Sequence, residues 1–151
     1  MSTSKINLQK VGKAWLPAII CMAAIFFLSS QPKLPAVPGL EEKDKAEHLI
    51  AYFTLGLLVL RGIFGYPFYR KIGPYTQTLM LSGLFGASDE FHQHFVPGRT
   101  MDIHDWYADL SGILIAIMLV STYHRLRKNG GKLYVRKRRE ELRGNRQTRR
   151  K

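Results

Sequence analysis

Apolar residues dominate the first 124 positions of the chain, and short polar stretches divide them into four segments. These segments cover about residues 14–30, 46–65, 72–91 and 105–123. A helix needs roughly 20 mainly apolar residues to cross the hydrocarbon core of a bilayer. Each segment meets or approaches that length. The pattern therefore predicts an all-α fold, an integral membrane four-helix bundle.

The first apolar segment has features of a secretory signal peptide as well as those of a membrane helix. Lys5, Lys10 and Lys13 precede it, as basic residues do in signal peptides. No small-x-small cleavage site follows closely, so we interpret the segment as a retained helix. The lone cysteine, Cys21, lies in this run, where we expect a buried apolar side chain and neither a disulfide nor a zinc ligand.

Residues 125–151 differ from the rest of the chain in charge. They hold 13 of the 23 Lys and Arg residues and only two acids, so most of the net charge of +12 belongs to them. Gly130 and Gly131 are expected to end the fourth helix. The chain is thus predicted to have a basic N-terminal arm over residues 1–13, a membrane domain over 14–124, and a disordered or partly helical basic C-terminal tail.

The distribution of basic residues predicts the orientation of the helices, because cytoplasmic loops carry an excess of Lys and Arg. The N-terminal arm and the tail are basic, and the second connection has Arg61, Arg70 and Lys71 without any acid. The first and third connections mix basic residues with acids. We therefore expect a multi-pass protein of the cell membrane, with both termini cytoplasmic and the first and third connections extracytoplasmic.

The basic tail is interpreted as a cytoplasmic anchor that follows the same rule and attracts anionic membrane lipids. Nucleic-acid binding is an alternative on charge alone. However, Tyr134 is the only aromatic residue in the tail, so base stacking has little support. We expect membrane lipids as partners and no specific nucleic acid.

Three of the predicted helices have a polar residue pattern on one face, because residues three or four apart share a face. The faces consist of His48, Tyr52, Gly56 and Val59; of Ser82, Gly86, Asp89 or Glu90, and Gln93; and of Asp105, Asp109, Gly112 and Ala116. Each face is polar toward the predicted outer side and small or apolar beneath. Small residues let membrane helices approach closely. The pattern predicts a tight bundle with a polar cup at its outer end, formed by His48, Asp89, Glu90, Gln93, Asp105 and Asp109.

Ionisable groups at membrane depth are costly and usually mark a working site. A turn at Pro97-Gly98 is expected to bring the third and fourth helices together, with Arg99 beside them. Our hypothesis is that Asp89 or Asp105 holds Arg99 and that an anionic head group competes for its guanidinium. The alternative is that these charges form a purely structural network.

Two stretches of the chain resemble the VanZ-like family of small membrane proteins. The first is DKAEHLIAYFTLGLL, residues 44–58, and the second is DEFHQHFVPGRTMDIHDWYADLSG, residues 89–112. The second stretch is the more specific, with Asp89, Glu90 and Arg99 at places of the family pattern. The resemblance implies a protein of the bacterial cell envelope that is linked to glycopeptide (teicoplanin) susceptibility and antibiotic resistance.

The leading interpretation is a membrane protein that engages an anionic or lipid-linked cell-wall component, or a glycopeptide, at the outer leaflet. The expected ligand-binding residues are Lys45, His48, Tyr52, Asp89, Glu90, Gln93, Arg99, Asp105 and Asp109. An enzyme that acts on a lipid phosphate or glycan is the alternative, with His48, Asp89 and Glu90 as candidate catalytic residues. A small transporter is the third. No HExxH motif or Cys/His cluster occurs, so neither a metal site nor a cofactor is expected, and divalent metal binding by the acids is a minor alternative.

Overall fold

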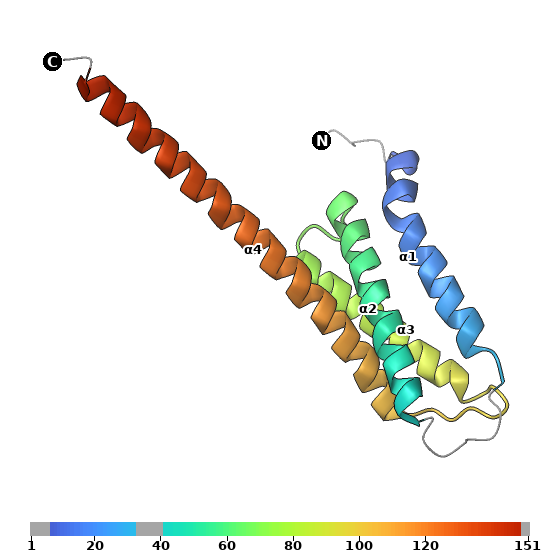
Figure 1. The fold of residues 1–151 in the computed structure, drawn as a ribbon. Coiled ribbons are helices and arrows are strands. Elements are labelled where there is room, and N and C mark those ends of the chain that lie inside the picture. Colours follow the sequence, from blue (N-terminus) through green and yellow to red (C-terminus); the bar gives the residue numbers. More distant parts are fainter. Residues whose placement is uncertain (1–6, 33–40, 149–151) are drawn as a thin grey trace. The chain divides into compact units, whose positions relative to one another are not determined.

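The computed structural model describes residues 7–32 and 41–148 and is helical, as predicted. In the described residues the chain forms four helices: α1 (Leu8–Ser29), α2 (Glu41–Gly65), α3 (Pro74–Gln93) and α4 (Ile103–Thr148) (Figure 1). The all-α, four-helix prediction is therefore confirmed. The basic arm predicted over residues 1–13 is helical from Leu8 onward, where the Asn7 side chain accepts a hydrogen bond from the backbone N–H of Lys10 and caps the helix.

Three of these helices are long and apolar enough to cross a membrane, judged by length and composition. They are Leu8–Ser29, Asp44–Gly65 and Ile103–Gly131, with mean hydropathies of 2.0, 1.6 and 1.4. The α3 helix, expected to be the fourth such segment, is not among them. Its polar residues, such as Ser82 and Gln93, are buried against the other helices and so lower its mean hydropathy without facing outward.

Large apolar side chains cover the outside of the bundle, as expected for a protein surrounded by lipid. Phe27, Ile50 and Leu84 are 65%, 62% and 66% exposed, respectively. Soluble monomers rarely expose contiguous apolar surface of this kind. The polar groups lie inside and the apolar groups outside, which is the arrangement that the hydrocarbon core of a bilayer requires.

The chain divides into two compact units, Met1–Ile117 and Met118–Lys151. The second unit is the continuation of α4, which stays helical to Thr148. The prediction that Gly130 and Gly131 end this helix is wrong, because both are helical. Glycine costs only about 1 kcal/mol of helix propensity, and the neighbouring lysine, arginine and leucine residues are good helix formers.

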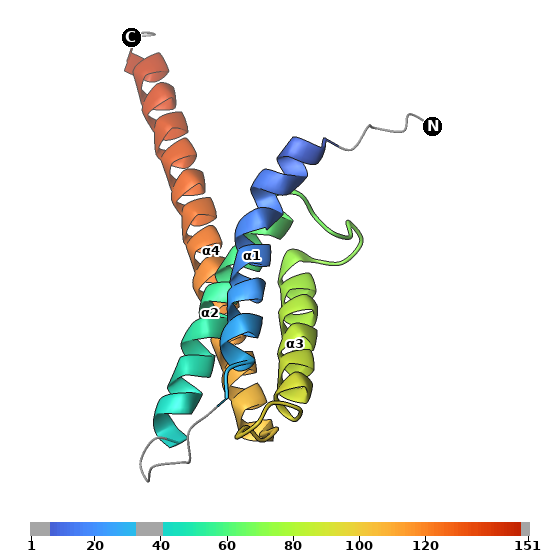
Figure 2. The ribbon, with the colours of Figure 1, turned by 90° about the vertical axis from the view of Figure 1, so that its right-hand side faces the viewer.

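The first unit is built around α2, and α1 and α3 run beside it (Figures 1 and 2). Its buried apolar core consists of Ala18, Tyr52, Leu55, Val59, Ile63 and Ile113. The α2 and α4 helices approach closely at small residues: a Cβ atom on Gly112 would overlap the backbone oxygen of Leu49 and lie 2.7 Å from the backbone nitrogen of Phe53. The predicted small-residue contacts are therefore present.

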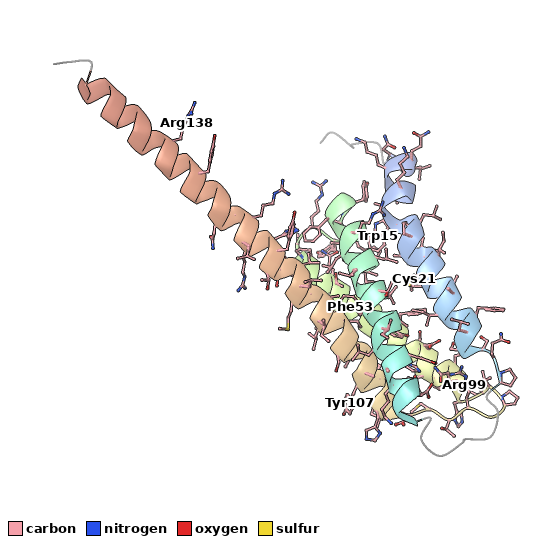
Figure 3. The ribbon with its side chains drawn as sticks, viewed as in Figure 1. Trp15, Cys21, Phe53, Arg99, Tyr107 and Arg138 are labelled. Atoms are coloured by element: carbon pink, nitrogen blue, oxygen red, sulfur yellow. The ribbon has the colours of Figure 1, made fainter. Side chains whose placement is uncertain are left out.

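Hydrogen bonds to backbone carbonyls fix the end of the first unit opposite the predicted polar cup. The indole Nε1 of Trp15, labelled on α1 in Figure 3, donates to the Tyr66 carbonyl at 2.9 Å. The guanidinium of Arg61 donates to the carbonyls of Lys13 and Ala14 at 3.1 and 3.2 Å. The side chain of Gln77 holds the turn before α3 by bonding the backbone on both sides of it.

Candidate functional site

Polar side chains from all four helices gather at one end of the first unit. This end holds the C-termini of α1 and α3 and the N-termini of α2 and α4, in the lower part of Figures 1 and 2. The buried polar residues there are Ser29, His48, Asp89, Glu90, Gln93, Asp105 and Asp109. All six residues of the predicted polar cup are thus buried at the same end of the bundle.

A tight turn joins α3 to the segment before α4, as the Pro97-Gly98 pair predicted. The backbone N–H of Arg99 donates to the Val96 carbonyl at 3.1 Å. Gly98 has a φ of 76°, in the left-handed region that glycine adopts without steric cost. Proline followed by glycine at the centre of such a turn is the expected pairing. The turn places Arg99 beside the end of α1.

The guanidinium of Arg99 binds backbone carbonyls and an amide side chain. Its Nε donates to the Gln31 carbonyl at 3.0 Å and its Nη2 to the Leu28 carbonyl at 3.1 Å. Its Nη1 donates to Oε1 of Gln93 at 3.2 Å. The hypothesis that Asp89 or Asp105 holds Arg99 is therefore wrong: its bonds go to the Leu28 carbonyl at the end of α1, to the Gln31 carbonyl two residues beyond that helix, and to Gln93. Figure 3 labels Arg99 at this end of the bundle.

Gln93 lies between the cation and the buried acids. Its Oε1 accepts from Arg99, while its Nε2 donates to Oδ2 of Asp89 at 3.2 Å and more weakly to Oε1 of Glu90 at 3.4 Å. An amide presents an acceptor to one side and two donors to the other. Gln93 can therefore satisfy a guanidinium and two carboxylates at once, which neither an acid nor a lysine could do.

Asp89 has a second partner that the sequence analysis did not identify. The hydroxyl of Ser29, at the C-terminal end of α1, donates to Oδ1 of Asp89 at 2.6 Å. Both residues are buried, at 6% and 2% exposure. The signal in the sequence was a Ser29-Ser30 pair at the end of the first apolar segment, where two hydroxyl groups interrupt an otherwise apolar run.

His48 and Asp109 form a buried pair between α2 and α4. The distance from His48 Nδ1 to Asp109 Oδ1 is 2.9 Å, and the two side chains are 10% and 0% exposed. Oε1 of Glu90 lies 3.8 Å from the same nitrogen. The imidazole is parallel to the ring of Tyr52, one helical turn away on α2, with ring centroids 6.5 Å apart. The carboxylates of α3 and α4 therefore meet at one histidine nitrogen.

A backbone group in the segment between α3 and α4 positions the side chain of Glu90. The backbone N–H of Asp102 donates to Oε2 of Glu90 at 3.1 Å. The Asp102 carboxylate itself accepts from the backbone N–H of His104 and contacts its imidazole Nδ1, both at 2.8 Å. These contacts lower the pKa of the Asp102 carboxyl below its usual range, with the backbone hydrogen bond as the largest cause.

A cavity of about 240 Å³ opens beside these polar groups. Its lining combines apolar side chains with charged and polar ones: Ile25, Leu28, Ser29, Asp44, Glu47, His48, Ala51, Tyr52, Asp89, Gln93 and Arg99. Asp44 and Glu47 were not among the predicted ligand-binding residues. Their signal was their position on α2, four residues and one residue before His48. The lining therefore mixes apolar side chains of α1 and α2 with polar side chains of α1, α2, α3 and the turn that follows α3.

The structure separates the remaining predicted residues from the cavity lining. Glu90, Asp105 and Asp109 belong to the buried polar cup but do not line the cavity. Lys45 is half-buried and also does not line it; its charge acts on Asp102. Two groups place histidine and carboxylate ligand atoms within 4.8 Å of one another, namely Asp44, His48 and Asp105, and His48, Glu90 and Asp109.

The chain has a relative in yeast and a match to a described family. An uncharacterized protein of Schizosaccharomyces pombe is 33% identical over 111 residues, which are 72% of this chain and 63% of that protein. The chain therefore spans less than two thirds of this relative's length. No solved structure matches this chain. The VanZ/LLP1 family model matches residues 14–124, which include both stretches that carry the resemblance and the whole polar cup. The chain belongs to the VanZ/LLP1 family.

Proposed function

We propose that this VanZ/LLP1 membrane protein binds the head group of a lipid-linked cell-wall component at the outer leaflet and thereby alters glycopeptide (teicoplanin) susceptibility. The observation that carries the proposal is the mixed lining of the cavity, in which Ile25, Leu28 and Ala51 occur together with Asp89 and Arg99. A lipid-linked molecule has an apolar chain beside a polar head. Binding sites of this kind are mostly apolar with a few placed polar groups.

The charges of the cavity favour a ligand with both anionic and donor groups. Arg99 is the lining residue suited to a phosphate, since a guanidinium binds two oxygens of an anion. Asp44, Glu47 and Asp89 also line the cavity and would repel a bare anion while accepting hydrogen bonds from hydroxyl or amino groups. A phosphate-linked glycan or peptide head group meets both requirements better than a simple anion does.

The basic residues of the chain indicate which side of the membrane the site faces. The second connection contains Arg61, Arg70 and Lys71, and the α4 continuation is strongly basic. By the positive-inside rule, the polar cup at the other end of the first unit is extracytoplasmic. In the same proposal, the basic residues of the α4 continuation contact anionic lipids of the cytoplasmic leaflet.

The test is glycopeptide susceptibility in a sensitive Gram-positive host that expresses the chain. Arg99→Ala and Asp89→Asn are compared with the wild type at matched membrane levels, because both residues line the cavity. Arg61→Ala is the matched control, since Arg61 also donates to carbonyls of α1 but at the opposite end. The expected result is a raised teicoplanin threshold with the wild type and Arg61→Ala, and with neither cavity variant.

Two outcomes would contradict this proposal. If the wild type behaves like an empty vector, the susceptibility role fails for this chain. If Arg99→Ala raises the threshold as much as the wild type, the role stands but the cavity is not its site. Binding of a purified lipid-linked precursor to the protein in nanodiscs distinguishes a failure of binding from a failure of the resistance phenotype.

A second candidate function is hydrolysis or transfer at the same cavity, and the His48–Asp109 pair favours it. A buried carboxylate 2.9 Å from one nitrogen orients the imidazole, and His48 borders the cavity. This is the arrangement of a general base and the group that positions it. The test is release of phosphate or glycan from a bound lipid precursor. Asp89→Asn should abolish turnover yet only weaken binding if the site is catalytic, whereas a pure binding site gives no turnover with any variant.

A further inference from the structure

Three ligand groups from three different helices meet beneath the cavity. His48 from α2, Glu90 from α3 and Asp109 from α4 place one ligand atom each within 4.8 Å of one another. The Nδ1 of His48 is 2.9 Å from Asp109 Oδ1 and 3.8 Å from Glu90 Oε1. Ligand atoms of one tetrahedral metal ion are separated by about 3.4 Å when the metal–ligand distance is about 2.1 Å. The two measured distances lie on either side of that value. We call this group the inner trio.

Buried polar atoms without partners lie at the inner trio. Oδ2 of Asp109 and the hydroxyl of Tyr52 are buried and have no hydrogen-bond partner among the described residues. A Cβ atom on Gly86 would lie 2.9 Å from Asp109 Oδ2 and 3.1 Å from Cε1 of Tyr52, so both side chains meet at this glycine. Both residues are 0% exposed. Buried polar atoms in this state usually have a ligand, water or ion as partner.

The acidic side chains of the polar cup favour a cation. Asp89, Glu90, Asp105 and Asp109 are each 6% exposed or less. Two of these carboxylates, those of Glu90 and Asp109, face the same nitrogen of His48. Buried like charges this close repel each other, and a divalent cation bound between them would offset that repulsion.

We propose that the inner trio binds one divalent transition-metal ion, with Zn²⁺ as the ion best matched to its ligands. One imidazole nitrogen and two carboxylate oxygens are ligands that Zn²⁺ accepts at about 2.0–2.2 Å, whereas Mg²⁺ and Ca²⁺ prefer oxygen alone. Three protein ligands leave one coordination position open. No metal site was expected from the sequence, because no local metal-binding motif is present. The three ligands come from three different helices and therefore form no such motif.

Groups around the inner trio hold its ligands in place. The backbone N–H of Asp102 binds Oε2 of Glu90 at 3.1 Å, which directs the other oxygen of this carboxylate to His48. Outer partners of this kind orient the ligands of metal sites. The second group, Asp44, His48 and Asp105, shares His48 and includes the half-buried carboxylate of Asp44. We assign the ion to the inner trio because the unpartnered Oδ2 of Asp109 lies there.

This proposal does not rest on the head-group proposal: Glu90 and Asp109 do not line the cavity, and His48 is the one ligand of the trio that does. The test uses the full chain, without an affinity tag, purified in detergent and stripped of metal with a chelator. Zn²⁺ uptake is measured by elemental analysis after dialysis and by titration calorimetry. Co²⁺ is added in parallel, since its visible absorption reports tetrahedral coordination. We expect one tightly bound ion and a higher unfolding temperature with Zn²⁺.

The variants Asp109→Asn and Glu90→Gln should each weaken Zn²⁺ binding by about tenfold or more, as loss of a metal ligand or its support does. The exposed pair His104 and Asp102, with the same two side-chain types 2.8 Å apart, provides the matched controls. His104→Gln and Asp102→Asn should leave the affinity within about twofold of the wild type, since both act outside the trio and Asp102 holds Glu90 through its backbone.

Three outcomes would overturn the proposal. The first is that the wild type retains no Zn²⁺ above the buffer level and gives no tetrahedral Co²⁺ spectrum, in which case protons balance the acids. The second is that His104→Gln removes the bound ion, which would place it on the surface. The third is that Asp44→Asn abolishes binding while Glu90→Gln leaves it intact, which would place the ion at the other group. The wild-type Co²⁺ spectrum keeps the test decisive even where a variant fails to fold.

Discussion

Two His–Asp pairs in this protein have almost the same contact but lie in opposite environments. His48 Nδ1 is 2.9 Å from Asp109, with side chains 10% and 0% exposed, and His104 Nδ1 is 2.8 Å from Asp102, with side chains 68% and 38% exposed. The buried pair joins α2 to α4, whereas the exposed pair joins residues two apart in sequence. The contact distance alone therefore does not tell which pair contributes more to the stability of the fold.

The difference between the pairs comes from the solvent. Water solvates each partner of an exposed ion pair nearly as well as the other partner does, so such pairs contribute about 0–1 kcal/mol. A buried pair gains little over well-packed apolar residues, but removal of one partner leaves a charge or polar group without compensation. The polar cup should therefore tolerate changes at its rim and resist changes at its centre.

The largest expected effect is that of breaking the buried pair. Asp109→Ala should lower the free energy of unfolding by about 3–5 kcal/mol, because His48 stays buried without its partner. Asp102→Ala should lower it by about 1 kcal/mol or less. Thermal unfolding in detergent, followed by the fluorescence of Trp15 and Trp106, measures both. Equal shifts for the two variants would contradict the importance of burial.

The next effect concerns the helix contact that brings the buried pair together. Gly112→Ala should destabilise the protein by about 1–3 kcal/mol, because its Cβ would overlap the backbone of α2 at Leu49. Gly12→Ala in α1 is the control, since no atom lies within 4 Å of its Cβ position. That change should be neutral or slightly stabilising, as alanine favours a helix. The same unfolding measurement applies, and a neutral Gly112→Ala would mean that α2 and α4 are farther apart.

Two adjacent serines repeat the comparison on a smaller scale. Ser29 is buried and donates to Asp89 at 2.6 Å, while half-buried Ser30 donates to the Phe26 carbonyl at 2.6 Å and has its hydroxyl 3.0 Å from Nε2 of His92. Ser29→Ala should cost about 1–2 kcal/mol, because a buried carboxylate oxygen loses a donor. Ser30→Ala should cost less, about 0.5 kcal/mol, because its partners are not buried carboxylates and remain partly accessible to water. If unfolding temperatures fall equally, the Asp89 bond has no special role.

The faces of the helices could be predicted from the sequence because helical spacing fixes them. His48 and Tyr52 on α2, and Asp105 and Asp109 on α4, are buried as their spacing predicted. The partner of each residue could not be predicted in the same way. Which atom of α4 meets His48 depends on the height and rotation of two helices relative to each other, which no local pattern contains.

The partners of Arg99, a loop residue, could not be predicted from the sequence either. The Pro97-Gly98 turn was predictable from its residue types, but the direction of the arginine side chain depends on where α1 ends. The carbonyl of Leu28, at the end of α1, and that of Gln31, two residues beyond it, bind Arg99 in place of the expected carboxylate. A prediction based on charge alone overlooked the backbone. The continuation of α4 through Gly130 was missed for a related reason, since glycine lowers helix propensity without forbidding a helix.

The smallest expected effect is the pH dependence of the exposed pair. The pKa of Asp102 in the folded protein is lowered by its bonds to His104. A carboxyl whose folded pKa is lowered stabilises the protein above its ordinary pKa, near 4, and loses that contribution as pH falls through the lowered value. The stability difference between wild type and Asp102→Asn should therefore be constant near neutral pH and shrink below about pH 4. Because solvent screens this pair, the difference should stay below about 1 kcal/mol throughout. Unfolding temperatures of both proteins between neutral and acidic pH measure it, and a difference that grows as pH falls would mean that the folded protein does not favour the ionised carboxylate.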